Sequence, residues 1–530
     1  MHSKKAALII NPRTGENVAK ITDVLTVLAA AGWETGIALK EYGGHTLELA
    51  NQATENNSDL VIAYGGDGTL NQVVNGVMNV KKQHSIVGVI PGGTANVWAG
   101  EVGIPTDPVK AALSLINSEP RKVDVGHVDI QSLTYPDGTS RTLPTAADNG
   151  KDNKKNKQPS KGNSKGRHHF LLMAGLGIDA AIMQHVSKPL KYRIGPLAVG
   201  FSAAKELPQQ HAFPIEIHST EKGRAGELLW QGEALQVVIG NTRRYANLTE
   251  MTPDAYIDDG ILDVCVITGG DPLSTLQQIT SLLLRRRPDN LSAEYFHGAH
   301  LSITVPASVP MQLDGSAVKL KDYLKKSEYT TLQQTGEAEH VMVTYRFDAM
   351  PQALEVAIPR TYNDELFEHT NGQDKTHEDI EHEHEPVKMA VHAHHHNDEG
   401  VSQTALHERI TTEEAQPKHE QDTKHAEEVK KELPTSVHAL LENGRKVTVV
   451  GRAPLPDRQS TWIIAGSTTK ASTGETRPVA VVVNEKTTIF NRQGDELPAG
   501  AIDELREGAA IIVDGKKSKR GVIEANRLLM

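Results

Sequence analysis

A glycine-rich turn between an apolar run and a helical pattern constrains the fold of this chain most. Residues 60–63 are all apolar, residues 64–71 read YGGDGTLN, and Val73, Val74 and Val77 follow at helical spacing. A strand that ends in glycines and continues into a helix can bind phosphate, because backbone N–H groups and the helix dipole then face the anion. The pattern therefore predicts a strand, an anion-binding turn and a helix in that order.

The acid inside this turn, Asp67, repels phosphate on its own and has no evident structural purpose there. It fits the turn if a divalent cation lies between the carboxylate and the phosphate, or if the carboxylate takes a proton from an attacking hydroxyl. Both roles indicate phosphoryl transfer. The alternative is that Gly65, Gly66 and Gly68 are ordinary turn glycines.

Strand and helix patterns alternate over residues 1–122. Strands are predicted at 6–10, 34–39, 60–63 and 86–90, and helical spacing lies between them, with Gly32 placed to end the first helix. Such alternation predicts a Rossmann-like α/β domain, in which helices cover a parallel sheet and ligands bind at the carboxyl ends of the strands.

The pattern changes to β over residues 123–360. Strands are predicted at 123–128, 170–174, 235–239, 261–267, 301–305 and 342–347, which indicates a β-sandwich as the second domain. The last strand could return to the first domain. A polar insert at 132–167 is predicted to be a mobile surface loop, with a basic patch for a membrane or partner as the alternative.

Two further segments complete the chain. Residues 361–435 are rich in His, Glu and Asp and predict a disordered linker, with metal sequestration by the histidines as the alternative. Residues 436–530 contain short strands divided by turns and predict a small β-barrel of the OB type. Aromatic and basic residues do not alternate there, so we expect an interaction module whose ligand is unknown.

Composition restricts the cellular compartment and the kinds of partner that we expect. The chain has 530 residues, and its net charge of −11 argues against nucleic acid as a main partner. Its one cysteine, Cys265, argues against an internal disulfide framework and for a reducing cytosol. No apolar run approaches the roughly 20 residues of a membrane span. We expect a cytoplasmic protein, with peripheral contact at the inner membrane face as an alternative for the basic end of the apolar segment 282–287. A homodimer stays open.

Six motifs in sequence order resemble the diacylglycerol kinase catalytic-domain family over residues 4–359. They are NPRTG at 11–15, GGDGTLN at 65–71, PGGTAN at 91–96, GLGIDA at 175–180, MTPDA with DDGILD at 251–263, and QLDG at 312–315. The resemblance implies an ATP-dependent lipid kinase that uses Mg²⁺ and phosphorylates a hydroxyl of diacylglycerol, or of a related lipid, at the membrane surface.

The resemblance also implies roles for individual residues. Catalysis falls to Asp314, as proton acceptor, and to Asp67, near the Mg²⁺ of the nucleotide. A structural Mg²⁺ would be bound by Asp259 and by the carbonyls of Tyr256 and Ile261. Contact with the nucleotide is implied for Asn11, Pro12, Arg13, Thr14, Gly15, Gly65, Gly66, Asp67, Gly68, Thr69, Leu70, Asn71 and Thr94.

Three positions depart from the family pattern. Val97 stands where many relatives have Asp, Ser316 where they have Glu, and Lys40 where a Thr commonly touches the nucleotide. A hydroxyl cannot replace a carboxylate as a base at neutral pH. Two alternatives therefore stay open: a NAD kinase-like enzyme, whose family shares GGDGT, and a catalytically weak nucleotide- or lipid-binding regulatory protein.

Overall fold

The computed structural model describes most of the chain outside its longest polar segments. The described residues are 4–143, 168–177, 212–268, 293–324, 329–330, 340–368 and 433–530, apart from short gaps at 13–14, 82, 246–248 and 471–472. The segments 144–167, 282–287 and 369–432, to which the expectations of a mobile insert, a lipid-docking helix and a disordered linker apply, lie outside the described residues.

The first unit is a parallel sheet in the order β4-β3-β1-β2. Its β3 is apolar and buried on both faces, as a parallel strand covered by helices must be. This arrangement confirms the predicted α/β class. The elements are β1 (Lys4–Ile10), η1 (Gly15–Lys20), α1 (Ile21–Ala30), β2 (Trp33–Leu39), α2 (His45–Glu55), β3 (Leu60–Gly65), α3 (Asp67–Met78), β4 (Ile86–Pro91), α4 (Val97–Glu101) and α5 (Pro108–Ile116).

The second unit is mainly antiparallel and encloses its own core, which includes Phe170 and Phe347. The sheet branches at β10, which pairs with β8, β9 and β13, so its strands fold over each other and confirm the expected sandwich. Its elements are β5 (Ser118–Thr134), β6 (Ser140–Thr142), β7 (His169–Phe170), β8 (Met173–Gly177), β9 (Phe213–Ser219), β10 (Leu228–Gly240), β11 (Arg244–Tyr245), β12 (Thr249–Glu250), β13 (Leu262–Thr268), β14 (Ala293–Gly298), β15 (His300–Pro306), β16 (Met311–Leu313), β17 (Ser316–Val318), η4 (Leu320–Asp322) and β18 (Met342–Pro359).

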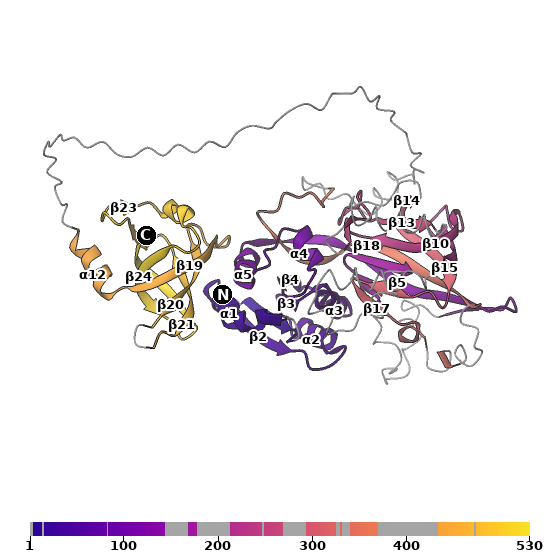
Figure 1. Cartoon of the computed structure of the whole chain (residues 1–530), viewed down its shortest axis with the longest axis horizontal. Coiled ribbons are helices and arrows are strands. Elements are labelled where there is room, and N and C mark those ends of the chain that lie inside the picture. Colours follow the sequence, from indigo (N-terminus) through magenta and orange to yellow (C-terminus); the bar gives the residue numbers. More distant parts are fainter. Residues whose placement is uncertain are drawn as a thin grey trace, which may run out of the picture.

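A long antiparallel ribbon of β5 and β18 connects the two units (Figure 1). It runs from the pair Met342 and Thr134 to the pair Pro359 and Ser118, and Val356 also pairs with β4. Both strands are much longer than the sequence predicts. The start of the expected insert is likewise a β5–β6 hairpin rather than a loop.

The C-terminal unit is a small barrel, as predicted. Five strands in the order β21-β20-β19-β24-β25 close through the pairing of β21 with β25. Its elements are α12 (Thr435–Asn443), β19 (Arg445–Pro454), β20 (Trp462–Thr469), β21 (Thr476–Val483), β22 (Thr488–Phe490), β23 (Glu496–Leu497), η5 (Ala499–Glu504), β24 (Ala510–Lys517) and β25 (Val522–Leu529).

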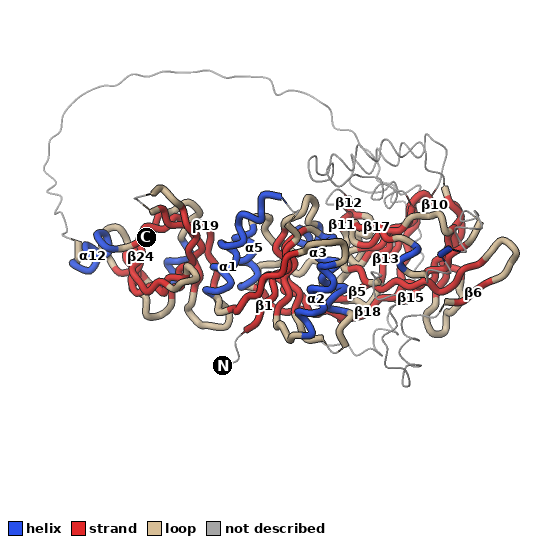
Figure 2. Tube along the Cα trace, turned by 90° about the horizontal axis from the view of Figure 1, so that it is seen from below, coloured by secondary structure: helices blue, strands red, loops and turns tan. Residues whose placement is uncertain are grey.

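The barrel packs against α1 and α5 of the first unit (Figures 1 and 2). Ile463 and Val482 of the barrel belong to the same buried apolar cluster as Val27 and Leu113. At the edge, Nζ of Lys110 lies 2.6 Å from Glu507. The apolar contact contributes most of the stability of this interface, because exposed ion pairs contribute little.

The chain stays packed beyond the point where the linker was expected to start. Leu366 and Phe367 are 2% and 3% exposed. The guanidinium of Arg121 lies 3.4 Å from the ring centre of Phe367 and 2.5 Å from Asp364. The described chain thus reaches Glu368 in contact with the domains. Among the described residues, no helix has the length and apolar character needed to cross a membrane.

Candidate functional site

Two glycine turns face each other at the carboxyl ends of β3 and β4. The N–H of Gly92 donates to the carbonyl of Gly65 at 3.0 Å. A Cβ on Gly93 would lie only 2.4 Å from the Cα of Gly66, so no side chain fits between the turns. The close backbone approach therefore requires glycine at positions 66 and 93.

The PGGTAN turn is closed by its own asparagine. Asn96 adopts a left-handed backbone with φ of 50°. Its side chain accepts a hydrogen bond from the N–H of Gly93 and donates to the carbonyl of the same residue, both at 2.8 Å. Thr94 is exposed at the tip of this turn. Its hydroxyl is thus presented to solvent on a turn of fixed shape.

Helix α3 starts at the YGGDGTLN turn, with Gly66 as the residue before it. The first N–H groups of an α-helix have no acceptor within the helix, so this end attracts anions. Asn11, which follows β1, is 7% exposed, and its side chain donates to the hydroxyl of Thr69 at 3.3 Å. The contact brings the first predicted phosphate loop beside the second.

The carboxylate of Asp67 has a structural partner. Its Oδ1 accepts a hydrogen bond of 3.2 Å from the backbone N–H of Trp98, in the first turn of α4. The expectation that an acid in this turn has no structural purpose is therefore wrong. Asp67 is only half-buried, however, so it can serve α4 and also face a ligand in the turn.

The carboxylate of Asp314 accepts four hydrogen bonds. It lies in a two-residue turn between β16 and β17, with φ of 46° at Asp314 and 70° at Gly315, as expected for a tight hairpin. Its Oδ1 accepts from the N–H groups of Leu172 at 2.9 Å and Met173 at 3.0 Å. Its Oδ2 accepts from the N–H of Leu171 and from Nδ2 of Asn71, both at 2.9 Å.

These four donors use the acceptor positions of the carboxylate. Burial raises the pKa of Asp314 to about 6, and the hydrogen bonds oppose that rise. Asp314 is 3% exposed, so a substrate hydroxyl cannot reach it as the structure stands. The predicted role of proton acceptor therefore does not fit this geometry; Asp314 instead holds the segment 171–173 against α3.

Helix α3 also holds the residues just before that segment. The side-chain Oδ1 of Asn75 accepts from the N–H groups of His168 and His169, each at 3.0 Å. Asn71 and Asn75 both donate to the carbonyl of His169 at 2.9 Å. The helix that begins at the anion-binding turn is thus tied, by two buried asparagines, to the second unit.

Ser316, two residues after Asp314, lies beside the anion-binding turn. A Cβ built on Gly68 would be 2.8 Å from the hydroxyl oxygen of Ser316. The side chain at position 316 therefore reaches the turn, whereas that at position 314 does not. If one of these two positions supplies a base in relatives, the geometry favours position 316.

A cluster of buried acids lies in the second unit, where the structural Mg²⁺ is expected. Asp259 and Asp124 are 7% and 0% exposed. Asp124 accepts hydrogen bonds of 2.6 Å from the N–H groups of Gly260 and Gln352, and Asp259 accepts one of 3.0 Å from Ile261. A cavity of about 180 Å³ lies beside the cluster, lined among others by Tyr256, Asp259 and Asp263.

Burial, with neighbouring negative charges, raises the pKa of the acids in this cluster. Burial, with the charges of Asp124 and Asp263, raises the pKa of Asp259 to about 9. Burial also raises the pKa of Asp124 and of Asp263 to about 7. Oxygen donors that repel each other in a confined space are what a hard divalent cation binds, and its charge would reverse these shifts. The residues present therefore fit Mg²⁺.

The structure brings together only part of the predicted nucleotide site. Asn11, the glycines, Asp67 and Thr94 lie at the two turns, whereas the side chains of Leu70 and Asn71 turn inward, Leu70 into the core. Pro12 is exposed and Gly15 starts η1, but Arg13 and Thr14 lie outside the described residues. Sequence reasoning missed Asn75 and Asp124, for which a buried polar residue within an apolar pattern is the available signal.

Two family models match the chain. One, described as the diacylglycerol kinase catalytic domain, matches residues 5–128. The other, described as the YegS C-terminal NAD kinase beta sandwich-like domain, matches residues 173–358. Together they span the two units that the β5–β18 ribbon connects.

Several curated relatives named diacylglycerol kinase are similar to this chain. The protein from Staphylococcus saprophyticus is 29% identical over 313 residues, which are 59% of this chain and 88% of the relative. That from Bacillus subtilis is 27% identical over 315 residues, 59% of this chain and 89% of the relative. That from Staphylococcus aureus is 30% identical over 285 residues, 53% of this chain and 76% of the relative.

A crystal structure described as a diacylglycerol kinase from Bacillus anthracis also resembles the chain. Its TM-score is 0.44 at 17% identity, and the match covers 68% of this chain and 98% of the other.

Proposed function

The chain belongs to the diacylglycerol kinase catalytic-domain family, and on this premise we propose that it transfers the γ-phosphoryl group of ATP to a hydroxyl of diacylglycerol or a related lipid. The observation that supports this most is the pair of facing turns at Gly66 and Gly93, backed by the N-terminus of α3. Backbone N–H groups at such a position stabilise phosphate without a flexible side chain.

The nucleotide would lie over the carboxyl ends of β3 and β4. Asn11 and the hydroxyl of Thr69 fix the first loop against the second, and Thr94 offers a hydroxyl from the third. Mg²⁺, when bound with ATP, supplies the charge that neutralises the phosphates. Asp67 is the carboxylate placed to face that charge, because it begins α3 at the turn itself.

We assign proton removal to a residue other than Asp314, which the motifs imply. Asp314 is occupied by its four donors and acts as a positioning residue. Ser316 can hydrogen-bond a substrate hydroxyl beside Gly68 but cannot take its proton at neutral pH. Asp67 is then the carboxylate left at the turn to accept the proton, and the remaining rate enhancement comes from positioning and charge stabilisation.

The structural Mg²⁺ would be held in the second unit by Asp259 and the carbonyls of Tyr256 and Ile261. Its role is to neutralise the acid cluster and so hold β13 and the adjacent turn in place. The lipid would enter from the membrane surface between the two units, which makes membrane contact peripheral.

Transfer of radiolabelled γ-phosphate from ATP to a panel of extracted lipids tests the function directly. We expect one lipid class to be labelled, and Asp67→Asn to lose at least 100-fold in kcat. A matched control is Asp59→Asn, whose carboxylate accepts from the backbone N–H of Lys5 at 2.7 Å, at the opposite end of β3. An Asp67→Asn enzyme as active as the wild type would refute the assignment.

A second candidate function follows from Ser316. With a hydroxyl at the position that reaches the turn, the chain is also suited to bind nucleotide with slow transfer, as a regulatory protein. Tight binding of Mg-ATP without labelling of any lipid, or of NAD as acceptor, would favour this candidate. Labelling of NAD would instead place the chain with the NAD kinase-like enzymes.

A further inference from the structure

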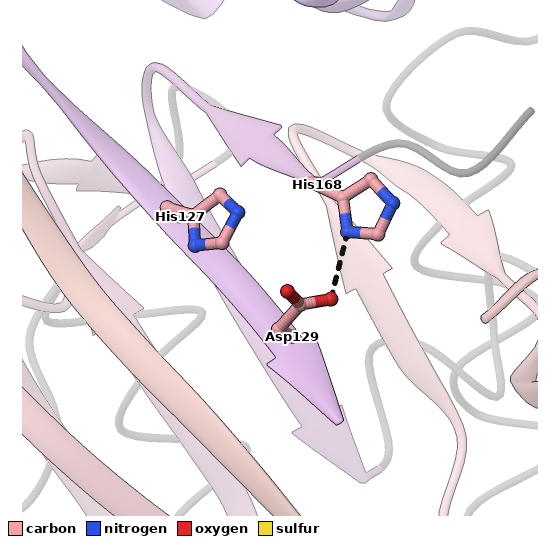
Figure 3. A group of neighbouring side chains, drawn as sticks. All are labelled: His127, Asp129 and His168. Atoms are coloured by element: carbon pink, nitrogen blue, oxygen red, sulfur yellow. Dashed lines mark ion pairs between the residues drawn. The ribbon is translucent and has the colours of Figure 1, made fainter. Parts of the chain in front are cut away.

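Two imidazoles and a carboxylate converge in the second unit, and none of the three residues belongs to the acid cluster described above. His127 and Asp129 lie two residues apart on β5, so both side chains project from the same face of that strand. His168 lies just before β7, which pairs with β5. One ligand atom from each of the three residues lies within 4.8 Å of the other two (Figure 3).

The spacing of these atoms is close to that of a metal site. Ligands about 2.0–2.1 Å from a tetrahedral ion are roughly 3.3 Å from one another. Nδ1 of His168 already lies 3.2 Å from Oδ1 of Asp129. Only the imidazole of His127 must move inward, by at most about 1.5 Å, which a small rotation of its side chain supplies.

A second carboxylate lies behind His127. Oδ2 of Asp348 is 3.9 Å from Nδ1 of His127, and Oδ1 of Asp348 accepts from Nδ1 of His300 at 2.8 Å. Histidines that bind metals commonly direct one ring nitrogen to a carboxylate and the other to the ion. In Figure 3 a ring nitrogen of His127 faces His168, on the side where an ion would lie.

We propose that His127, Asp129 and His168 bind a divalent transition-metal ion of the kind that prefers imidazole, such as Zn²⁺. Three protein ligands leave one position for water. The donor set separates this site from the all-oxygen cluster at Asp259, which suits Mg²⁺. The three side chains are 14–19% exposed, so an ion can enter from solvent and is then largely shielded from it.

The location links the ion to the kinase site. The backbone N–H of His168 is held by Asn75 of α3, and the following residues donate to Asp314. An ion bound to the His168 side chain would fix the start of this segment from its other side. Nδ1 of His168 also lies 3.2 Å from the carbonyl oxygen of Val128, so the competing interpretation is that His168 only donates to this carbonyl and pairs with Asp129.

The test must exclude the histidine-rich stretch of the same chain. We would replace the histidines between positions 369 and 425 by serine in the full-length protein and titrate it with Zn²⁺ by calorimetry. We expect one tight equivalent, its loss in the double variant His127→Asn/His168→Asn, and a 10- to 100-fold weaker site in Asp348→Asn. His218→Asn, on β9, should bind as the parent does.

Metal-free unfolding midpoints of the variants show whether each one folds, and Asp129→Asn gives a conservative variant if the double one does not. Loss of the equivalent in Asp129→Asn with an unchanged metal-free midpoint supports the site. Zn²⁺ binding of unchanged stoichiometry and affinity in a folded double or Asp129→Asn variant overturns it, as does the absence of any equivalent in the parent.

Discussion

Nδ2 of Asn71 donates a hydrogen bond of 2.9 Å to Oδ2 of Asp314, which joins positions 243 residues apart in the chain. Asn71 is the last residue of the GGDGTLN motif and Asp314 the third of QLDG, so two motifs that the sequence offers as separate catalytic elements form one buried contact. The contact is one of those that hold the second unit beside the anion-binding turn.

Asn71→Ala should destabilise the protein by about 1–3 kcal/mol, because a buried carboxylate oxygen loses a donor. Activity should fall with stability, since one of the two asparagines that tie α3 to the second unit would be lost while Asn75 remains. Thermal unfolding and lipid phosphorylation measured on the same samples check this. Asn79→Ala, at the exposed end of α3, is the matched control, and equal behaviour of the two variants would contradict the role of Asn71.

Gly93→Ala should weaken nucleotide binding more than it weakens the fold. The added Cβ would meet the Cα of Gly66 at 2.4 Å, so the two turns must separate and the N–H groups move away from the phosphates. We expect a KM for ATP raised at least 10-fold. Gly43→Ala is the control, because a Cβ there meets nothing within 4 Å; a KM unchanged in Gly93→Ala would exclude the facing turns as the site.

Ser316→Glu should raise kcat by roughly 10- to 100-fold, because it places a carboxylate beside Gly68, and general-base catalysis is worth about 10²–10⁴-fold. The gain should depend on pH and be lost as the new carboxyl is protonated. Steady-state kinetics from pH 5 to 8 measure it, with Ser316→Gln as the isosteric control. A similar rate in all three proteins would show that position 316 takes no part in proton removal.

Mg²⁺ without nucleotide should stabilise the protein more at pH 8 than at pH 6. The pKa values of Asp124 and Asp263 are raised to about 7 and that of Asp259 to about 9, above their unfolded values near 4. Folding therefore takes up protons, and without a cation stability declines as the pH rises from about 4 to 9. Mg²⁺ binds the deprotonated acids and counteracts that decline.

The gain should approach about 2.7 kcal/mol at a Mg²⁺ concentration 100 times Kd, and calorimetric unfolding midpoints measure it. Asp259→Asn should abolish it, whereas Asp137→Asn, in an exposed turn, should retain it. An equal Mg²⁺ effect at both pH values would argue against the acid cluster as its site.

The parts of the fold that the sequence predicts are those with a local signal. The buried strand at 60–65 and the glycine turn after it are specified by neighbouring residues, and the structure has both. The full length of β18 has no such signal, because Pro351 and a register shift between Met350 and Leu354 interrupt its pattern. Its continuation depends on pairing with β5, more than 200 residues earlier.

In the candidate site, too, local features can be predicted from the sequence and long-range contacts cannot. The Asp-Gly turn at 314–315 can be predicted locally, and φ is positive at both residues. That its carboxylate is enclosed by three backbone N–H groups arises from the approach of residues 171–173, which no local pattern encodes. A motif thus predicts which side chain matters here, but not whether it faces a substrate.

The packing of the barrel against α1 and α5 has a consequence for cleavage of the chain within residues 369–432. The chain is held by buried Phe367 before this stretch and by Leu440, buried in α12, after it, so the parts on either side stay attached through the contact of the barrel with α1 and α5. A protease that cut this stretch once would leave two fragments that travel together through a sizing column, until denaturant pulled the apolar faces apart.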